Sequence, residues 1–340
     1  MSMSTVASLA VAAAFVVALP LSAQSGAPVG NVERIKVHSP AIEGNLQGNT
    51  ADRDVLVYLP PSYASSRNRR YPVVYQLHGW LPGGEQWAGM IDFEAGSNRA
   101  LASGNSKEMI VVVPDSLTIH GGSMYSTSVT SGDFEGFIAR DLVAHVDSHY
   151  RTLAKRESRG LSGHSMGGYG TWRIAMKYPE LYSSFYAMSS CCLSPYSAEG
   201  LDEAGRISTL EDAAKAPIFT RVSLTLAAAW SPNPAKPPLY FDFPIENGVL
   251  KPLVLTKWNA NVPLANIDQH VPALRTFKAI GIEVGTQDGL IGDNKQISDV
   301  LTSYGIDHVY ETYEGNHTNK VAERYETRVL PFFSRELVFE

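Results

Sequence analysis

Short apolar segments alternate along this chain with stretches that have helical periodicity. The segments that predict strands cover residues 32–38, 53–59, 71–77, 108–113, 158–162, 279–285 and 308–313, with one more inside 181–189. Helices are predicted over 134–147, where apolar side chains recur at amphipathic spacing, and over 168–178 and 321–338. This alternation predicts an α/β fold with a mostly parallel central sheet and helices on both faces. Ligands bind at the carboxyl ends of the strands in such sheets, so the loops there form the candidate functional rim.

Residues 193–277 depart from this pattern. A helix is predicted over 210–226, four prolines between positions 232 and 238 exclude regular structure, and aromatic residues follow at 240, 241 and 243. We expect an insertion that folds over the rim as a partial lid. The alternative is a peripheral helical excursion with no role in the site.

The composition suits one large domain. The chain has 340 residues, of which 44% are hydrophobic and 18% charged, so it can form a full core and is not a disordered chain. We therefore expect a single domain over residues 30–340. The net charge of −6, without a Lys/Arg-rich run, argues against nucleic acid as a partner.

The first residues predict export. Residues 6–21 are almost wholly apolar and small residues follow, which is typical of a secretory signal peptide over residues 1–23, although no Lys or Arg precedes the apolar run. The alternative is an uncleaved membrane anchor, but the run is shorter than the ~20 residues of a spanning helix. No cysteine follows for lipid attachment. We expect a secreted or periplasmic protein without a stable membrane anchor.

The two cysteines, Cys191 and Cys192, are adjacent. A bond between them would close a small strained ring, because ordinary disulfides hold their Cα atoms further apart than neighbouring residues allow. The sequence leaves open whether they form this bond or remain thiols.

A nucleophile is indicated by residues 163–167, which have the form Gly-x-Ser-x-Gly. A predicted strand precedes the motif and a predicted helix follows it, as in a nucleophile elbow that exposes the serine above a sheet. Ser165 is the predicted nucleophile. The alternative is a glycine-rich turn with a surface serine.

A serine hydroxyl needs a base and an orienting acid, in the chain order Ser, Asp or Glu, His. His317 follows the last predicted strand and is the expected base. Asp288 directly follows the strand over 279–285 and is the expected acid, with Asp293 as its rival.

Backbone N–H groups are expected to bind the oxyanion of the reaction. One is that of Met166, at the start of the helix after the nucleophile. The other is that of Trp80, in the loop after the strand over 71–77, with Leu81 as the alternative. His78 is expected to hold this loop through a ring hydrogen bond.

These motifs form an ordered set that includes His-Gly-Trp at 78–80, Gly-His-Ser-Met-Gly-Gly at 163–168, Gly-Thr-Gln-Asp at 285–288 and Gly-Asn-His at 315–317. The set resembles the esterase D and feruloyl esterase group of the α/β-hydrolase superfamily, which also includes the secreted mycolyltransferases. The resemblance implies a triad of Ser165, Asp288 and His317 that acts on carboxylic esters with neither a metal nor an organic cofactor. The resemblance is weaker over 193–277, where Trp230 and Tyr240 are the candidate substrate-binding residues.

We therefore expect a serine esterase for a small or aromatic-acid (feruloyl-type) ester. One alternative is an acyltransferase that passes the acyl group to an alcohol. Another is a non-catalytic binding protein on a hydrolase scaffold. The expected partner is a small-molecule ester, and the sequence indicates no oligomeric state.

Overall fold

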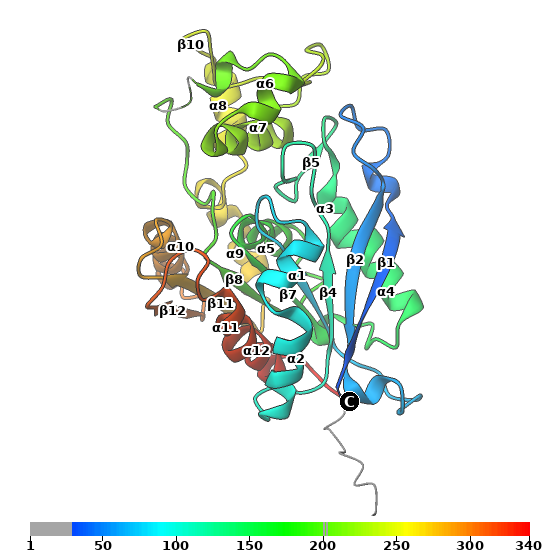
Figure 1. Cartoon of the computed structure of the whole chain (residues 1–340). Helices are drawn as coiled ribbons and strands as arrows, with labels where there is room; N and C mark the ends of the chain where they lie inside the picture. The colour runs from blue at the N-terminus through cyan, green and yellow to red at the C-terminus, as the bar shows by residue number, and fades with distance from the viewer. Residues whose placement is uncertain (1–28, 200, 202) are drawn as a thin grey trace, which may run out of the picture.

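The computed structural model describes residues 29–199, 201 and 203–340, so the predicted signal peptide over 1–23 lies outside the described residues. Eight strands form one sheet in the order β1-β2-β4-β3-β7-β8-β11-β12 (Figure 1). Their bounds are β1 Asn31–His38, β2 Asp52–Leu59, β3 Val73–Leu77, β4 Ile110–Pro114, β7 Arg159–His164, β8 Ser184–Met188, β11 Ala279–Gly285 and β12 Val309–Tyr313. Only β2 runs against its neighbours, and the other pairs are parallel.

Successive residues of the inner strands face opposite sides of the sheet, so each face has its own core. On β2, Val55 and Val57 belong to one hydrophobic cluster, whereas Leu56 and Tyr58 belong to the other. The first cluster includes residues of α3 (Phe134–Gly136), α4 (Val143–His149) and α5 (Met166–Lys177). The second includes residues of α1 (Gly84–Met90), α2 (Phe93–Ala102), α11 (Val321–Arg324) and α12 (Leu330–Glu336). The predicted α/β arrangement with helices on both faces is confirmed.

Two predicted helices contain a π-helical turn. Residues Phe137–Leu142 join α3 to α4, and Tyr325–Val329 join α11 to α12. Hydrophobic periodicity places such helices but does not predict the turn, which shifts the helix face by one residue.

A buried ion pair ties α11 to the sheet. Glu283 on β11 accepts two hydrogen bonds from the Arg324 guanidinium, at 2.9 and 2.6 Å, and one from the Tyr186 hydroxyl at 2.7 Å. Burial nevertheless raises the pKa of the Glu283 carboxyl. This contact fixes the helical segment that follows the His317 loop.

Residues 193–277 leave the sheet between β8 and β11. They form α6 (Leu210–Lys215), α7 (Ile218–Trp230), the short pair β9 (Ile245–Glu246) and β10 (Val249–Leu250), α8 (Pro252–Asn259) and α9 (Val271–Leu274). The helix predicted over 210–226 is split at Ala216, whose extended ψ of 148° is the conformation favoured before a proline. The proline-rich residues 232–238 contain no helix or strand, as predicted.

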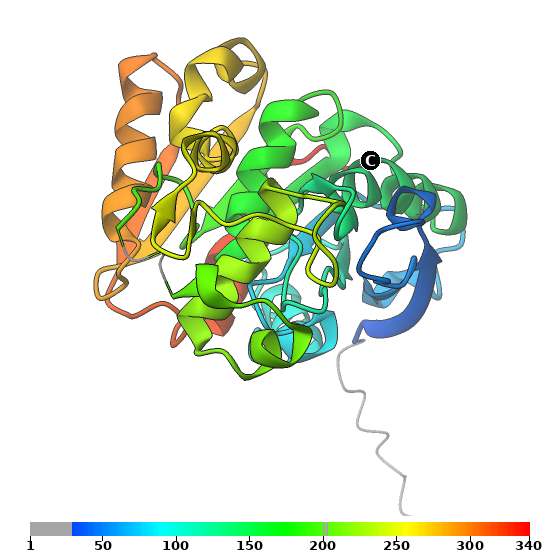
Figure 2. The same cartoon turned by 90° about the horizontal axis from the view of Figure 1, so that it is seen from above.

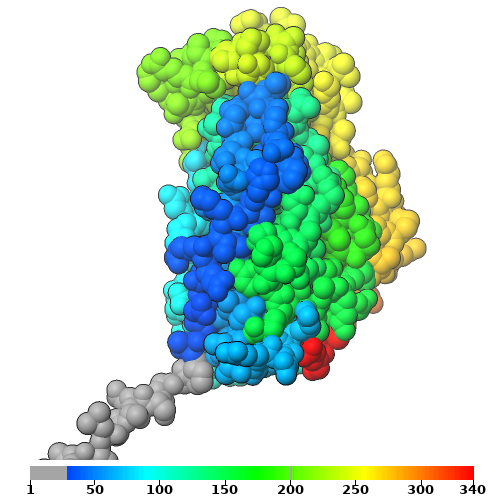
Figure 3. Space-filling view, turned by 90° about the vertical axis from the view of Figure 1, so that its right-hand side faces the viewer, coloured from blue at the N-terminus to red at the C-terminus, as the bar shows by residue number. Residues whose placement is uncertain are grey.

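Three helices of the insertion gather beyond the carboxyl ends of the parallel strands, whereas α9 packs against α5. Figures 1 and 2 show α6, α7 and α8 together over this end of the sheet. The loop between β1 and β2 reaches the same region (Figure 3), where the Gln47 side chain donates to the Leu239 carbonyl at 3.2 Å. Among the described residues, no helix is both long enough and apolar enough to cross a bilayer.

Candidate active site

Ser165 stands on a sharp turn between β7 and α5. Its φ of 57° and ψ of −114° lie in a region that non-glycine residues rarely adopt. The glycines of the motif permit this turn. A Cβ added to Gly163 would lie 2.3 Å from the Gly167 carbonyl oxygen, and one added to Gly167 would lie 2.2 Å from the Leu77 carbonyl oxygen. The Gly-x-Ser-x-Gly pattern therefore has a steric cause at both glycines.

The structure brings Ser165, His317 and Asp288 together from three loops at one edge of the sheet. The Ser165 Oγ lies 2.9 Å from His317 Nε2, and His317 Nδ1 lies 2.8 Å from Asp288 Oδ2. An ionised carboxylate only accepts, so Nδ1 carries the ring proton and Nε2 accepts from the serine hydroxyl. This is the arrangement in which an imidazole can remove the serine proton.

Asp288 is held as a carboxylate. Burial alone would raise the pKa of its carboxyl, but the His317 ring and the Leu290 amide, at 3.0 Å, hold that pKa below its ordinary value. The rival Asp293 lies instead in the first turn of α10 (Ile291–Ser303), where it accepts from the Ser194 hydroxyl at 2.7 Å. In the described part of the chain, no three His, Cys, Asp or Glu side chains are grouped to hold a metal ion.

His164 supports the loop that carries His317. Its Nε2 donates to the His317 carbonyl oxygen at 2.7 Å, and its ring stacks on Trp87 with centroids 5.1 Å apart. Burial, followed by the neighbouring His317, lowers the pKa of His164 to about 3, so the ring stays neutral. The sequence gave no signal for this contact, because it joins two loops 153 residues apart.

The loop after β3 lies against the nucleophile, since a Cβ at Gly79 would be 3.5 Å from the Ser165 Cβ. The alternative donor Leu81 is occupied, because its N–H donates to the Gly121 carbonyl at 2.9 Å. No hydrogen bond within the described residues engages the N–H of Trp80. Met166 is the first residue of α5, where N–H groups have no intrahelical acceptor.

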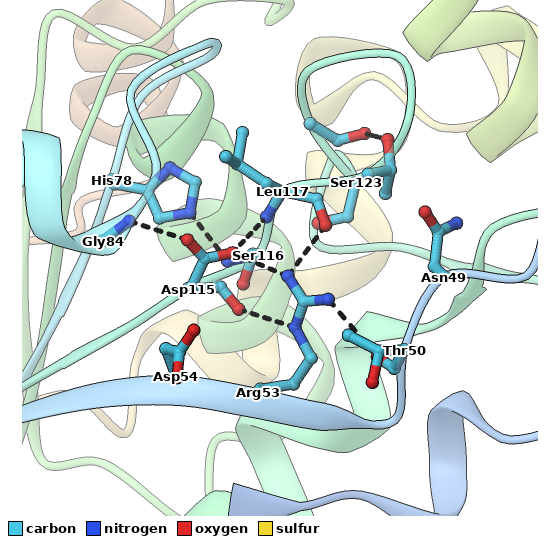
Figure 4. A network of polar contacts seen from close by, with 12 residues as sticks. Asn49, Thr50, Arg53, Asp54, His78, Gly84, Asp115, Ser116, Leu117 and Ser123 are labelled. Atoms are coloured by element: carbon cyan, nitrogen blue, oxygen red, sulfur yellow. Dashed lines mark hydrogen bonds and ion pairs between the residues drawn. The ribbon is translucent and has the colours of Figure 1, made fainter. Parts of the chain in front are cut away.

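His78 orients this loop as expected. The Ser116 N–H donates to His78 Nε2 at 2.7 Å (Figure 4). Nδ1 therefore carries the proton and donates to the Gly79 carbonyl at 2.7 Å. Burial lowers the pKa of His78 and keeps this neutral tautomer. The Gly79 carbonyl and the Trp80 N–H belong to one planar peptide group, so fixing the first also aims the second.

An ion pair lies next to this contact. The Arg53 guanidinium donates to the Asp115 carboxylate at 2.6 Å, and the same carboxylate accepts from the Gly84 and Leu117 amides at 3.0 and 2.9 Å (Figure 4). These bonds fix the loop after β4 beside the loop after β3. The residues that orient the Trp80 peptide therefore sit in a rigid polar network.

The insertion also contacts this loop through Thr225 of α7. The Trp80 indole N–H donates to Thr225 Oγ1 at 2.8 Å, and the Thr225 hydroxyl donates to the His120 carbonyl at 2.7 Å. Thr225 is buried, and its place within a predicted helix gave no sign of this role. The contact makes α7 a support of the loop that holds Trp80.

The structure places Trp230 differently from its expected position in a substrate-facing lid. Its side chain is only 3% exposed and packs against Tyr169 of α5, with ring centroids 5.5 Å apart. Its indole N–H donates to Ser126 Oγ at 3.2 Å. Trp230 belongs to the packed contact between the insertion and α5, because the last turn of α7 buries its apolar face there. Tyr240 is half-buried, and its carbonyl accepts from the Thr130 hydroxyl at 2.5 Å. Among the described residues, no hydrogen bond joins its side chain to Ser165, Asp288 or His317.

The chain has relatives among esterases. The model of the Esterase family matches residues 49–321. An endo-1,4-beta-xylanase/feruloyl esterase of Xylanibacter ruminicola is 29% identical over 174 residues, which are 49% of this chain and 22% of that protein. An esterase of Mycobacterium tuberculosis is 36% identical over 140 residues, which are 40% of this chain and 28% of that protein. The chain thus spans less than a third of these relatives.

Solved structures share the fold over most of the chain. A ferulic acid esterase has a TM-score of 0.63 at 20% identity, with 91% of this chain and 99% of that chain covered. An S-formylglutathione hydrolase of Staphylococcus aureus has a TM-score of 0.60 at 16% identity, with 90% and 99% covered. With the α/β-hydrolase fold and the family model in agreement, the chain belongs to the Esterase family, and these relatives support its predicted resemblance to the esterase D and feruloyl esterase group.

Proposed function

We propose that this protein hydrolyses carboxylic esters through an acyl-enzyme on Ser165. The observation that carries the proposal is the continuous hydrogen-bonded chain from Ser165 through His317 to Asp288. In the first step His317 takes the hydroxyl proton while Oγ attacks the ester carbonyl. Asp288 holds the imidazole and stabilises its charged form.

The amides of Trp80 and Met166 bind the oxyanion of the tetrahedral intermediate. Trp80 is proposed because its N–H is unengaged among the described residues, and Met166 because it begins α5. His317 then protonates the leaving alcohol, and a water molecule releases the acid by the same route. The triad supplies a nucleophile and a base, and these two amides supply the oxyanion hole, so the proposed reaction needs neither a metal nor an organic cofactor.

The proposed substrates are esters of small or aromatic acids, including feruloyl-type esters. The names of the xylanase/feruloyl esterase relative and of the ferulic acid esterase neighbour favour this class. We also propose that residues 193–277 act as a partial lid, because α6, α7 and α8 lie together beyond the carboxyl ends of the parallel strands (Figures 1 and 2), where β7, β11 and β12 lead into the loops of the proposed triad. The apolar first residues favour action outside the cytoplasm, as a secreted or periplasmic enzyme.

The test is Ser165→Ala with short-chain, long-chain and hydroxycinnamoyl esters. Turnover should fall on the order of 10⁶-fold, because the nucleophile itself is lost. A fluorophosphonate should label the unaltered protein at Ser165 and leave the variant unlabelled. Near-normal hydrolysis by the variant would refute the assignment. The absence of labelling in the unaltered protein would favour a non-catalytic binding role.

Added alcohols separate hydrolysis from acyl transfer. A hydrolase releases the free acid as the main product, whereas a transferase forms the new ester at the expense of the acid. Chromatography of the products with increasing alcohol concentration gives this ratio directly.

A further inference from the structure

Cys191 and Cys192 lie beside the nucleophile, on the loop that follows β8. Both are free thiols and both are half-buried, with their sulfur atoms 2.8 Å apart. The backbone N–H of Cys191 donates to the carbonyl oxygen of Ser165 at 3.2 Å. These are the only cysteines in the chain, so all of its thiol chemistry is located next to the proposed catalytic serine.

The surrounding structure holds the two thiols in contact. Asn294 of α10 accepts from the Ser190 N–H at 3.1 Å and donates to the Ser190 carbonyl at 2.9 Å. The peptide group between Ser190 and Cys191 is therefore fixed on both sides, by Asn294 and by Ser165. Cys192 has a φ of 58°, in the left-handed region that a non-glycine residue seldom adopts. This backbone holds the two sulfur atoms in contact.

We propose that Cys191 and Cys192 are a redox modification site, and that their closure into a vicinal disulfide lowers turnover at Ser165. The inference rests on the proposed function for its activity readout, whereas the disulfide itself can be measured separately. The oxidant is a small-molecule disulfide, for which oxidised glutathione is the probe.

The reaction proceeds by two thiol–disulfide exchanges. A thiolate of the pair attacks the small disulfide, breaks its S–S bond and releases one small thiol, which leaves a mixed disulfide on the protein. The other cysteine then attacks the protein sulfur of the mixed disulfide, forms the Cys191–Cys192 bond and releases the second small thiol. In total, two protons and two electrons pass from the two cysteines to the small disulfide.

At neutral pH the thiol form of Cys191 is favoured. The neighbouring Cys192 thiol, followed by burial, raises the pKa of Cys191 well above its ordinary value. Because the thiolate is the reactive form, this shift slows the attack of Cys191 on an oxidant.

Closure of the ring should disturb the elbow. A disulfide draws the sulfur atoms together to about 2.05 Å, and it normally spans Cα atoms further apart than the ~3.8 Å between neighbours. The peptide between the two cysteines must therefore twist. Because the Cys191 N–H donates to the Ser165 carbonyl, a twist of this peptide should also displace the backbone of Ser165.

The experiment compares the full chain in dithiothreitol with the full chain in oxidised glutathione. Intact mass should fall by about 2 Da in the oxidant, and kcat for an activated ester should fall on the order of tenfold, as small displacements of catalytic groups allow. Dithiothreitol should restore both values. The Cys192→Ala variant should keep the reduced-state activity and, in the oxidant, gain at most one glutathionyl group.

An unchanged mass in the oxidant would overturn the disulfide. A fall in mass with no change in kcat would overturn its effect on Ser165. A reduced protein that hydrolyses none of the esters would refute the proposed function, while the mass measurement would still test the disulfide.

Discussion

Replacing Thr225 with valine tests whether the insertion supports the loop after β3, which carries the proposed oxyanion donor Trp80. Valine keeps the shape of threonine but removes the hydroxyl, which accepts from the Trp80 indole at 2.8 Å and donates to the His120 carbonyl at 2.7 Å. The indole would keep only its longer bond to the same carbonyl, at 3.2 Å. The His120 carbonyl would in turn lose its stronger donor.

The size of the effect follows from these two bonds. A buried polar group without its partner costs about 1–3 kcal/mol, and part of this cost is relieved when the Trp80 loop moves. Complete loss of one oxyanion donor lowers kcat by about 10²–10³-fold. Displacement of the Trp80 peptide should therefore lower kcat on the order of tenfold, with little change in KM because the oxyanion forms only after the substrate binds.

Steady-state kinetics with an activated ester measure this split between kcat and KM. Thr225→Ser retains the hydroxyl and should recover most of the lost kcat. Thr220→Val is the matched control, since Thr220 is buried on the same helix and its hydroxyl makes no hydrogen bond to this loop in the described structure. Unaltered kcat in a folded Thr225→Val protein would refute the support role, and so would an equal loss in Thr220→Val.

Three further predictions concern the acid of the triad, a buried charge and a buried imidazole. Asp288→Asn should lower kcat by about 10⁴-fold in ester assays, because an amide does not hold the imidazole in the required tautomer, while Asp293→Asn should stay within a fewfold of normal. Arg324→Leu should cost about 3–5 kcal/mol in denaturant unfolding because it strands the buried β11 carboxylate, whereas Arg328→Leu, at an exposed pair, should cost below about 1 kcal/mol. Burial, followed by a nearby guanidinium, lowers the pKa of His120 to about 4. The ordinary pKa of a histidine in the unfolded chain is 6.5, so between these two values the unfolded chain binds more protons than the folded protein. The folded state therefore loses stability as pH falls from 6.5 to about 4. His120→Gln should remove up to about 2 kcal/mol of that loss near pH 5 in unfolding measured across this range, and an unchanged slope would contradict the buried neutral ring.

The strands were predictable because buried parallel strands need continuous apolar residues. The strand predicted over 279–285 matches β11, and the other predictions differ mainly at their ends. The helix predicted over 210–226 failed at Pro217, where the proline ends one helix and begins the next. Periodicity averages over a window and does not resolve a break of two residues.

The meeting of Ser165, Asp288 and His317, the proposed triad, was predictable from strand order, because each follows a strand whose carboxyl end lies at the same edge. The roles of Thr225 and His164 were not predictable from the sequence, since each depends on a contact between segments that lie far apart in the chain. For Trp230 the sequence predicted a functional contact, and the structure shows a packing contact instead. An aromatic residue in an insertion is compatible with a binding surface or with a core, and in this structure the rings of Tyr169 and Trp258 pack around Trp230.

The packing of the insertion also bears on how the proposed substrate choice can change in this protein. Helix α5 carries Met166 at its start and contacts the insertion through Tyr169, whose hydroxyl donates to the Asn261 carbonyl at 2.8 Å. Thr225 contacts the Trp80 loop from the same insertion. The inner face of residues 193–277 is thus part of the scaffold that holds both proposed oxyanion donors, and substitutions there should alter kcat for all esters together. Selectivity between esters can change independently only through side chains that do not take part in these contacts, which directs the search for specificity to the outer loops of the insertion and away from Trp230.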